Sequence, residues 1–178
     1  MLNTYAFCRN LQGSPKCPNT VDEMRGAYMN CTNLTGSPVC GSNVVYMGSH
    51  TKTNNVWYHY GAYSNCINLT GSPVCGNKVT TMASAYYNCR NLSGAPACGQ
   101  AVTNMNNAYR LCPNIYGNAY YYSRNISDVT SCFSGRNTSR RLNIYCYQNS
   151  TTNNTLHRTH TNNSLLGSTI SWTNAGTY

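Results

Sequence analysis

Residues 31–40 read Cys-Thr-Asn-Leu-Thr-Gly-Ser-Pro-Val-Cys, and this arrangement of residue types recurs along the chain. Copies begin at Cys8, Cys31, Cys66 and Cys89, and a degenerate copy begins at Cys112. The shared pattern is C-x-N-L-x-G-x-P-x-C, and its leading cysteines are 23, 35, 23 and 23 residues apart. Self-similarity at a fixed period of roughly 20 to 50 residues is typical of repeat architectures. The repeat therefore decides the fold.

A second half follows each copy and reads V-x-x-M-x-x-A-Y-x-x-C. It occupies residues 21–31, returns at 79–89 and 102–112, and is recognisable in decayed form from Ile126. Its apolar spacing of three and four residues predicts a short helix or 3₁₀ turn. The first half contains glycine and proline, which favour an extended, turn-rich segment with at most a short strand.

The interval of 35 marks an irregular junction near residues 44–60. Either two periods of 23 have lost 11 residues, or one period has gained 12. We favour the loss, because Val44 and Met47 begin one V-x-x-M half and Val56 and His59 begin another. This interpretation predicts an irregular loop or bulged coil around Ser49 to Asn55.

The period predicts a repeat solenoid, because a single coil cannot bury its apolar residues and must stack on its neighbours. Equivalent positions should then form ladders. A tyrosine ladder is expected at Tyr28, Tyr63, Tyr86 and Tyr109. Asparagine amides both donate and accept hydrogen bonds, so a polar ladder is expected beside a leucine ladder. These two ladders comprise Asn10, Asn33, Asn68, Asn91 and Asn114, and Leu11, Leu34, Leu69, Leu92 and Ile115.

The repeats divide the chain into two regions. Residues 1–135 should form about five coils, and residues 136–178 should form a C-terminal cap or the start of another module. Residues 142–147 alternate as a strand does, residues 150–160 could form a short helix, and residues 165–172 read as a second strand. Met1 occupies the methionine position of a repeat, so we expect the chain to be a fragment of a longer array.

The composition argues against an enzyme. Charged residues make up 8% of the chain, and Asp and Glu together number 3. Paired-carboxylate catalysis and hard-cation binding both need more carboxylates than this. The sequence also has no G-x-S-x-G elbow and no common phosphate-binding glycine loop. We expect no catalytic residues, no cofactor and no metal site, and no apolar run long enough to span a membrane is present.

The cysteines leave two interpretations open. The Cys-x8-Cys spacing occurs four times, and the chain has 11 cysteines. They can pack as small buried apolar side chains, or they can form disulfides if the protein is exported, with at least one thiol left over because 11 is odd. Zinc sites favour shorter Cys spacing or added histidine.

The pattern resembles the BspA-like class of bacterial leucine-rich repeats, and it is also similar to Asn/Tyr/Gly-rich arrays of phage tail-fibre and virion-surface proteins. The resemblance covers roughly residues 1–135 and implies leucine-rich-repeat-like coils and an extracellular, cell-surface or virion location. One departure stands out: the family's apolar L-x-x-I-x-I-P strand is replaced here by Leu-Thr-Gly-Ser-Pro-Val-Cys-Gly at residues 34–41. We therefore expect only short strands or bridges in each coil.

Two functions follow from these expectations. The first is non-catalytic adhesion to a glycan or host-surface polymer, and the second is a structural spacer or self-assembling fibre segment whose coils stack end to end. The net charge of +9 favours anionic partners. Nucleic acid is not expected among them, because the sequence has no run of basic residues. Ladder residues are buried, so binding falls to aromatic and basic residues outside them. Tyr121 fits either the core or the binding face. The candidate residues are Trp57, Tyr58, Tyr60, Tyr120, Tyr122 and Arg124.

Overall fold

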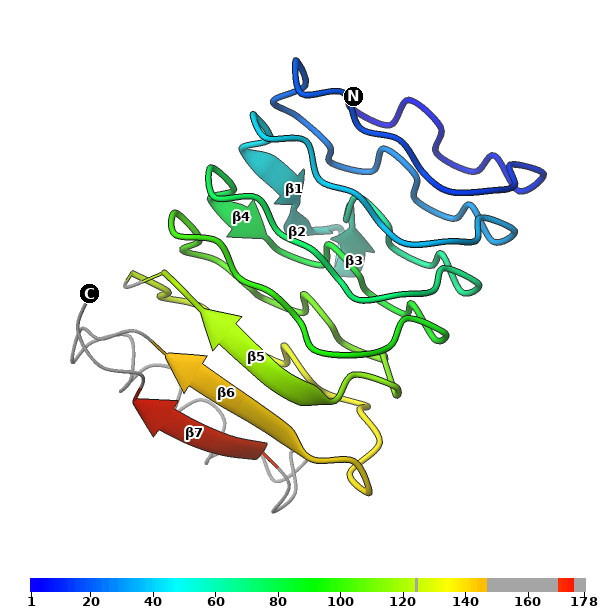
Figure 1. Ribbon diagram of the computed structural model, residues 1–178. Coiled ribbons are helices and arrows are strands. Elements are labelled where there is room, and N and C mark those ends of the chain that lie inside the picture. Colours follow the sequence, from blue (N-terminus) through cyan, green and yellow to red (C-terminus); the bar gives the residue numbers. More distant parts are fainter. Residues whose placement is uncertain (124, 147–169, 175–178) are drawn as a thin grey trace.

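The repeats of the chain lie side by side as successive circuits, called coils below (Figure 1). The computed structural model describes residues 1–123, 125–146 and 170–174. Backbone hydrogen bonds join each coil to the next at matching positions. The N–H groups of Tyr5, Tyr28 and Tyr86 donate to the carbonyl oxygens of Ala27, Ala62 and Ala108, with N–O distances of 2.8, 2.8 and 2.9 Å. The sequence repeat therefore sets the register of stacking.

Strand pairing is sparse in the first four coils and fuller near the C-terminal end. Strands β1 (Tyr46–Gly48) and β4 (Thr81–Met82) pair in parallel, and β2 (His50–Thr53) and β3 (Val56–His59) form an antiparallel hairpin. Strands β5 (Gly117–Tyr121), β6 (Leu142–Cys146) and β7 (Ile170–Asn174) form a parallel sheet in that order (Figure 1). Isolated parallel bridges extend the β1–β4 pairing into a column of residues on successive coils: Glu23, Tyr46, Thr81, Asn104 and Asp128. Two further bridges join Gly94 to Ile115 and Cys98 to Tyr121.

The prediction of a helix or 3₁₀ turn in the V-x-x-M-x-x-A-Y segment is wrong. None is found in the described part of the chain, where these segments form separate turns. Alternate N–H groups have different partners: Ala27 donates to Met24 in its own coil, whereas Tyr28 donates to Ala62 in the next. A helix would use every N–H within its own segment, so stacking and helix formation compete here, and stacking prevails.

A column of aromatic rings runs through the interior. Adjacent ring centroids are 5.2 to 5.8 Å apart and interplanar angles do not exceed 15°. The leucine position forms a second buried column in which Leu34, Leu69, Leu92 and Ile115 are fully or almost fully buried and Leu11 is half-buried. The rings, in chain order, are those of Tyr5, Tyr28, Tyr63, Tyr86, Tyr109 and Phe133.

Each inner tyrosine also crosses its coil to the residue that follows the proline. The Tyr63 hydroxyl donates to the Val39 carbonyl oxygen at 2.6 Å and accepts from the Val39 N–H at 3.2 Å. Tyr86 makes the same pair of bonds with Val74, at 2.7 and 3.2 Å. Tyr28 repeats the arrangement on Lys16. These bonds hold together two walls of the coil, which we call the methionine wall (21–24, 44–47, 79–82, 102–105, 126–129) and the proline wall (13–17, 36–40, 71–75, 94–98).

Replacing Tyr86 by phenylalanine tests this bridge. Tyr86→Phe keeps the buried ring and leaves the N–H and C=O of Val74 without their partner, so the free energy of unfolding should fall by about 1–2 kcal/mol. Urea unfolding followed by circular dichroism measures the change. Tyr58→Phe on the exposed hairpin is the matched control and should change stability little. An unchanged unfolding midpoint for Tyr86→Phe would show that the hydroxyl does not hold the walls together.

A left-handed residue follows each column ring by two positions. Its φ lies between 57° and 81° in all six coils, where glycine and asparagine are tolerated best. Asparagine occupies this position in three coils, and the three side chains form a hydrogen-bonded chain. Asn65 Nδ2 donates to Asn30 Oδ1 at 3.0 Å, and Asn88 Nδ2 donates to Asn65 Oδ1 at 2.9 Å. The six residues are Phe7, Asn30, Asn65, Asn88, Leu111 and Gly135.

Leu111 occupies this left-handed position at a steric cost, with φ of 60° and an exposed side chain. Leu111→Asn should therefore raise the free energy of unfolding by about 1 kcal/mol, because asparagine adopts this backbone conformation more readily. The control is Leu2→Asn, which removes an exposed leucine from a residue whose φ is not positive. Chemical denaturation compares the two variants. Equal effects of both substitutions would contradict the backbone explanation.

The irregular junction is an insertion within one turn, so the predicted loss of 11 residues is wrong. Ala62 N–H donates to Met47 O at 2.7 Å, which is the bond that Ala85 makes to Met82 at 2.8 Å. Between Met47 and Ala62 the chain extends into the β2–β3 hairpin, where Asn54 and Asn55 turn with φ of 50° and 61°. Val56 and His59 belong to this hairpin and begin no new repeat. The expected irregular loop is thus a regular hairpin.

Deleting residues 49–60 should leave a folded protein. The deletion joins Met47-Gly48 to Gly61-Ala62-Tyr63 and thereby reproduces the M-x-G-A-Y order of residues 24–28. Because the hairpin leaves the coil between two paired residues, its removal should change unfolding free energy by about 1 kcal/mol or less. A deletion of equal length inside a regular coil, residues 26–37, removes core side chains and should abolish folding. Loss of cooperative unfolding in both variants would contradict the insertion.

Strand β5 is the proline-wall segment of its coil with the proline replaced. Its residues Gly117 to Tyr121 stand where earlier coils have G-x-P-x-C, and Ala119 stands at the proline position. Proline lacks the N–H that a sheet ladder needs, which explains why earlier coils have no strand here. Strand β6 pairs with all five residues of β5, so stacking continues past residue 135. The helix expected at residues 150–160 lies outside the described residues.

Candidate functional site

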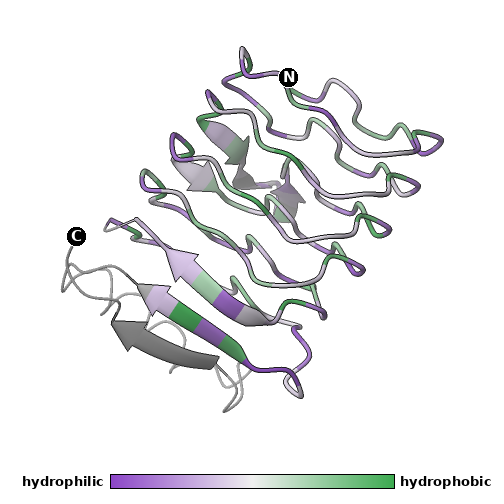
Figure 2. Ribbon diagram, in the orientation of Figure 1, coloured by the Kyte–Doolittle hydropathy of each residue, from purple (hydrophilic) through white to green (hydrophobic). Residues whose placement is uncertain are grey.

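Side chains on β5 alternate between core and surface, and the apolar Ala119 lies between more hydrophilic residues of the strand (Figure 2). Ala119 and Tyr121 are fully buried, which places Tyr121 in the core. Asn118 and Tyr120 are exposed between them, and exposed tyrosines also stand just before and just after the strand. Successive residues of a strand point to opposite faces. The outward residues of β5 and β6, together with the exposed tyrosines that flank β5, therefore form one surface. We call it the tyrosine strip, and it comprises Tyr116, Asn118, Tyr120, Tyr122, Asn143 and Tyr145.

Contacts within the tyrosine strip order its side chains. The rings of Tyr120 and Tyr145 stack with centroids 4.9 Å apart and planes 16° apart. Asn143 Nδ2 donates to Asn118 Oδ1 at 2.7 Å. The Arg140 guanidinium lies over the Tyr116 ring, 4.7 Å from its centroid. These pairs restrict side-chain rotation before any ligand binds, which lowers the entropy cost of binding.

The strip's charge comes from arginine. Arg140 and Arg141 are exposed in the turn before β6. Arg136 supports this turn from a buried position, where its Nη1 donates to the carbonyl oxygens of Asn137, at 3.1 Å, and Arg140. Burial lowers the pKa of the Arg136 guanidinium, and an arginine nevertheless stays charged at neutral pH. Arg124 lies outside the described residues.

The three carboxylates of the chain lie elsewhere, beside or within the bridge column of the methionine wall. Arg25 Nη2 and Nε donate to Glu23 Oε2 at 2.6 and 2.9 Å. Burial raises the pKa of the Glu23 carboxyl, but the hydrogen bonds from Arg25 outweigh burial and the net pKa is lowered. Asp128 Oδ2 accepts from Asn106 Nδ2 at 3.0 Å. The proline wall and the tyrosine strip therefore carry positive charge without a carboxylate.

The hairpin holds the other predicted binding residues. Tyr58 is exposed and Tyr60 is half-buried, and their rings stack with centroids 5.8 Å apart. Trp57 pairs with Lys52 through its backbone in β3, and its side chain lies outside the described part. The hairpin leaves the methionine wall, whereas Tyr120 and Tyr122 continue the proline wall. The structure thus places the five candidates of the described chain in two separate groups, Trp57, Tyr58 and Tyr60 on the hairpin and Tyr120 and Tyr122 at β5.

His59 fixes the hairpin to the coils rather than forming a catalytic pair. Its Nδ1 lies 2.9 Å from Ser84 Oγ, and its ring stacks on Tyr87 with centroids 4.0 Å apart. A serine next to a histidine can be a nucleophile. Ser84, however, is fully buried, so a substrate has no access to its hydroxyl.

Apart from Cys132, which stands at the alanine position of its repeat, the described cysteines form two columns of thiols. The leading thiols donate to tyrosine carbonyl oxygens, with Sγ–O distances of 2.9 Å for Cys31 and Cys66 and 3.0 Å for Cys89. Burial raises the pKa of Cys31 to about 11 and that of Cys75 to about 12. None of the ten cysteines with described side chains forms a disulfide. Among described residues no group of three or more His, Cys, Asp or Glu could hold a metal ion.

The predicted asparagine ladder bonds mainly to backbone. Asn68 Nδ2 donates to the Thr32 carbonyl oxygen at 2.9 Å and Asn114 Nδ2 to that of Arg90 at 3.0 Å, whereas Asn91 Nδ2 donates to Asn68 Oδ1 at 3.3 Å. Asn10 and Asn33 are exposed in the first two coils. The chain of amides through Asn30, Asn65 and Asn88 was not expected. The recurring Asn-Cys pair at these positions is the signal that could have indicated it.

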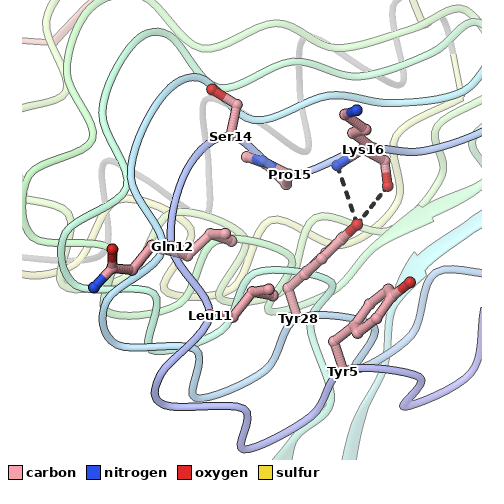
Figure 3. A pocket seen from close by; sticks show the side chains of 8 residues that line it. Tyr5, Leu11, Gln12, Ser14, Pro15, Lys16 and Tyr28 are labelled. Atoms are coloured by element: carbon pink, nitrogen blue, oxygen red, sulfur yellow. Dashed lines mark hydrogen bonds between the residues drawn. The ribbon is translucent and has the colours of Figure 1, made fainter.

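A hollow of about 190 Å³ opens at the first coil, between the Tyr5 ring and the Ser14–Lys16 segment (Figure 3). Leu11 and Tyr28 line it, and the Tyr28 hydroxyl is bonded to the Lys16 backbone at its edge. The hollow therefore exposes part of the apolar interior of the coil.

Comparisons with known proteins add no further assignment: no family model, curated protein or solved structure matches this chain. The resemblance to BspA-like repeats therefore stays a prediction. Within the described residues no helix has the length and apolar character that crossing a membrane requires.

Proposed function

We propose that this chain is a leucine-rich-repeat-like solenoid of the BspA-like kind that acts as a non-catalytic binding protein on a cell or virion surface. It binds a glycan or another surface polymer through the tyrosine strip. The resemblance of its repeat supports the class and the extracellular location. The chemistry of the strip supports the binding role.

One observation carries the proposal: the tyrosines of the strip point outward, unlike the inner tyrosines of the repeat column. Tyr116, Tyr120 and Tyr122 are 39 to 43% exposed, whereas Tyr63, Tyr86 and Tyr109 are fully buried. Aromatic rings beside amides and a guanidinium suit a polymer rich in hydroxyl groups, because rings contact sugar faces and the polar groups supply hydrogen bonds. An extended face formed by neighbouring strands also suits an extended ligand.

A panel of immobilised neutral and acidic polysaccharides tests the proposal. The full chain should be retained on at least one polymer, and Tyr120→Ala should weaken that retention about tenfold, as loss of a central aromatic contact does. Tyr120 is exposed, so the variant should unfold at the wild-type urea concentration. Tyr58→Ala on the hairpin is the matched control and should bind normally. Absence of retention on every polymer would refute the proposal.

A structural spacer or self-assembling fibre is the alternative, favoured by the apolar surface of the first coil. Leu2 and Phe7 are 58 and 59% exposed there, in the same coil as Tyr5 and Leu11, which line the hollow. Apolar side chains of this size are commonly covered by a partner. Sedimentation velocity across a hundredfold range of concentration distinguishes the two functions, since long assemblies favour the fibre and a monomer favours the binding protein.

A further inference from the structure

We propose that the tyrosine strip selects an anionic glycan, with Arg140 and Arg141 binding its sulfate or carboxylate groups. This inference rests on the proposed function and names the ligand class of the same surface. It depends on three features of the strip, namely the covered ring faces, the placement of charge and the support of the arginine turn.

The rings offer limited surface for a neutral sugar. Tyr145 covers one face of Tyr120, with centroids 4.9 Å apart, and Arg140 lies over one face of Tyr116. Each of these rings therefore has at most one face for a sugar to stack on. The strip also carries tyrosine hydroxyls, asparagine amides and guanidinium N–H groups. Most of these groups donate hydrogen bonds, and guanidinium and amide N–H groups pair best with ionised oxygen acceptors.

Charge on this side of the molecule has one sign. Arg140 and Arg141 border the strip, and Lys16 is exposed on the same proline wall. Glu23 and Asp128 lie in the bridge column of the methionine wall, and Asp22 precedes Glu23 in the chain. A ligand on the strip therefore meets cations without a competing carboxylate. Such an arrangement of charge favours binding of an anionic polymer over a neutral one.

The arginine turn is held in place before binding. Arg136 bonds the carbonyl oxygens of Asn137 and Arg140 from inside the fold, and Asn137 Oδ1 accepts from the Ser139 N–H at 2.9 Å. The Arg140 guanidinium rests on Tyr116, 4.7 Å from its centroid. A guanidinium presents a planar fork of donors that matches a carboxylate or sulfate group. Because the guanidinium of Arg140 is already held in place, it can bind a carboxylate or sulfate group of a polymer in a defined geometry, which a loosely associated counterion does not require.

Single-stranded nucleic acid is the competing anionic polymer, and the strip suits it less well. Protein surfaces that bind single strands stack successive bases on open aromatic faces. Here Tyr120 and Tyr145 stack on each other. A nucleic acid would therefore contact the strip mainly through its phosphates, without the added energy of base stacking.

Biolayer interferometry on the full chain tests the inference with four probes: dextran, dextran sulfate, polygalacturonate and single-stranded poly(dT). Dextran and dextran sulfate share a backbone and differ in charge, so their comparison isolates the anionic group. We expect binding to dextran sulfate or polygalacturonate, weaker binding to poly(dT), and little binding to dextran. Affinity should fall as NaCl rises from 0.05 to 0.5 M, because salt screens charge.

Matched variants locate the contact. Arg140→Gln combined with Arg141→Gln should weaken acidic-glycan binding at least about tenfold, because two charge-assisted contacts are lost. Lys52→Gln combined with Lys78→Gln removes the same charge away from the strip and should weaken binding less than about threefold. Tyr120→Phe keeps the ring and removes its hydroxyl, so it should weaken binding less than Tyr120→Ala does.

Several outcomes overturn the inference, and they differ from failure of the proposed function. Equal binding to dextran and dextran sulfate, with both lost in Tyr120→Ala, would keep polymer binding and refute anion selection. Tighter binding to poly(dT) would assign the strip to nucleic acid. Equal losses in the arginine and lysine double variants would show non-specific attraction by net charge. Retention on none of the polymers would refute the proposed function itself.

Discussion

The hydrogen bonds between each inner tyrosine hydroxyl and the residue after the proline are the interaction on which the coils depend: Tyr28, Tyr63 and Tyr86 both donate and accept, and Tyr109 donates to the Ala97 carbonyl oxygen. Proline removes an N–H from the proline wall and prevents a sheet ladder there. The next residue then needs another partner for both its N–H and its C=O. A hydroxyl both accepts and donates, so Tyr63 satisfies both groups of Val39. Its ring, 5.5 Å from that of Tyr28 and of Tyr86, joins the coil to its neighbours.

The last part of the chain shows what happens when this arrangement is not needed. Ala119 replaces the proline, and strand β5 pairs with β6 along its full length. The column residue of the same coil is Phe133, which stacks on Tyr109 and has no hydroxyl. The backbone of β5 has strand partners, so a phenolic bridge is unnecessary there. The replacement of proline by Ala119 also makes the tyrosine strip possible. It allows β5 and β6 to pair, and outward positions on paired strands can hold large, ordered side chains. Tyr120 and Tyr145 stand where earlier coils have Lys16, Val39, Val74 and Ala97.

The sequence could predict which positions are buried, because residue identity recurs at fixed spacing. The rings and leucines of the repeat lie in the core for this reason. Spacing could not predict local conformation, since V-x-x-M-x-x-A-Y fits a helix as well as a set of turns. The difference lies in Tyr28, whose N–H bonds to Ala62 of the next coil. Asn30 and Gly26 carried a signal, since both types tolerate the positive φ that they have here.

The junction could not be assigned correctly from apolar spacing alone. Val56 and His59 are three residues apart, which imitates the start of a repeat, although both lie on a hairpin strand. Turn chemistry was the better guide. Asn54-Asn55 between β-forming residues indicates a two-residue hairpin, and Gly61-Ala62-Tyr63 matches Gly26-Ala27-Tyr28. Trp57 and Tyr58 were predicted to bind a ligand because they lie outside the ladders, although a position outside a ladder does not by itself require a ligand.

Placement on the two walls decides between the candidate surfaces. The tyrosines that cross each coil lie between the methionine wall and the proline wall; Tyr58 is on the hairpin that leaves the methionine wall, and Tyr120 continues the proline wall. On the methionine wall Arg25 is paired with Glu23, and Asp128 lies in the same bridge column. On the tyrosine strip Arg140 rests on Tyr116 and Arg141 is exposed beside it. The strip thus combines ordered aromatic rings with positive charge that no neighbouring carboxylate neutralises, whereas the hairpin adjoins the wall that carries the carboxylates. Binding of an extended anionic polymer therefore fits the strip better than the hairpin.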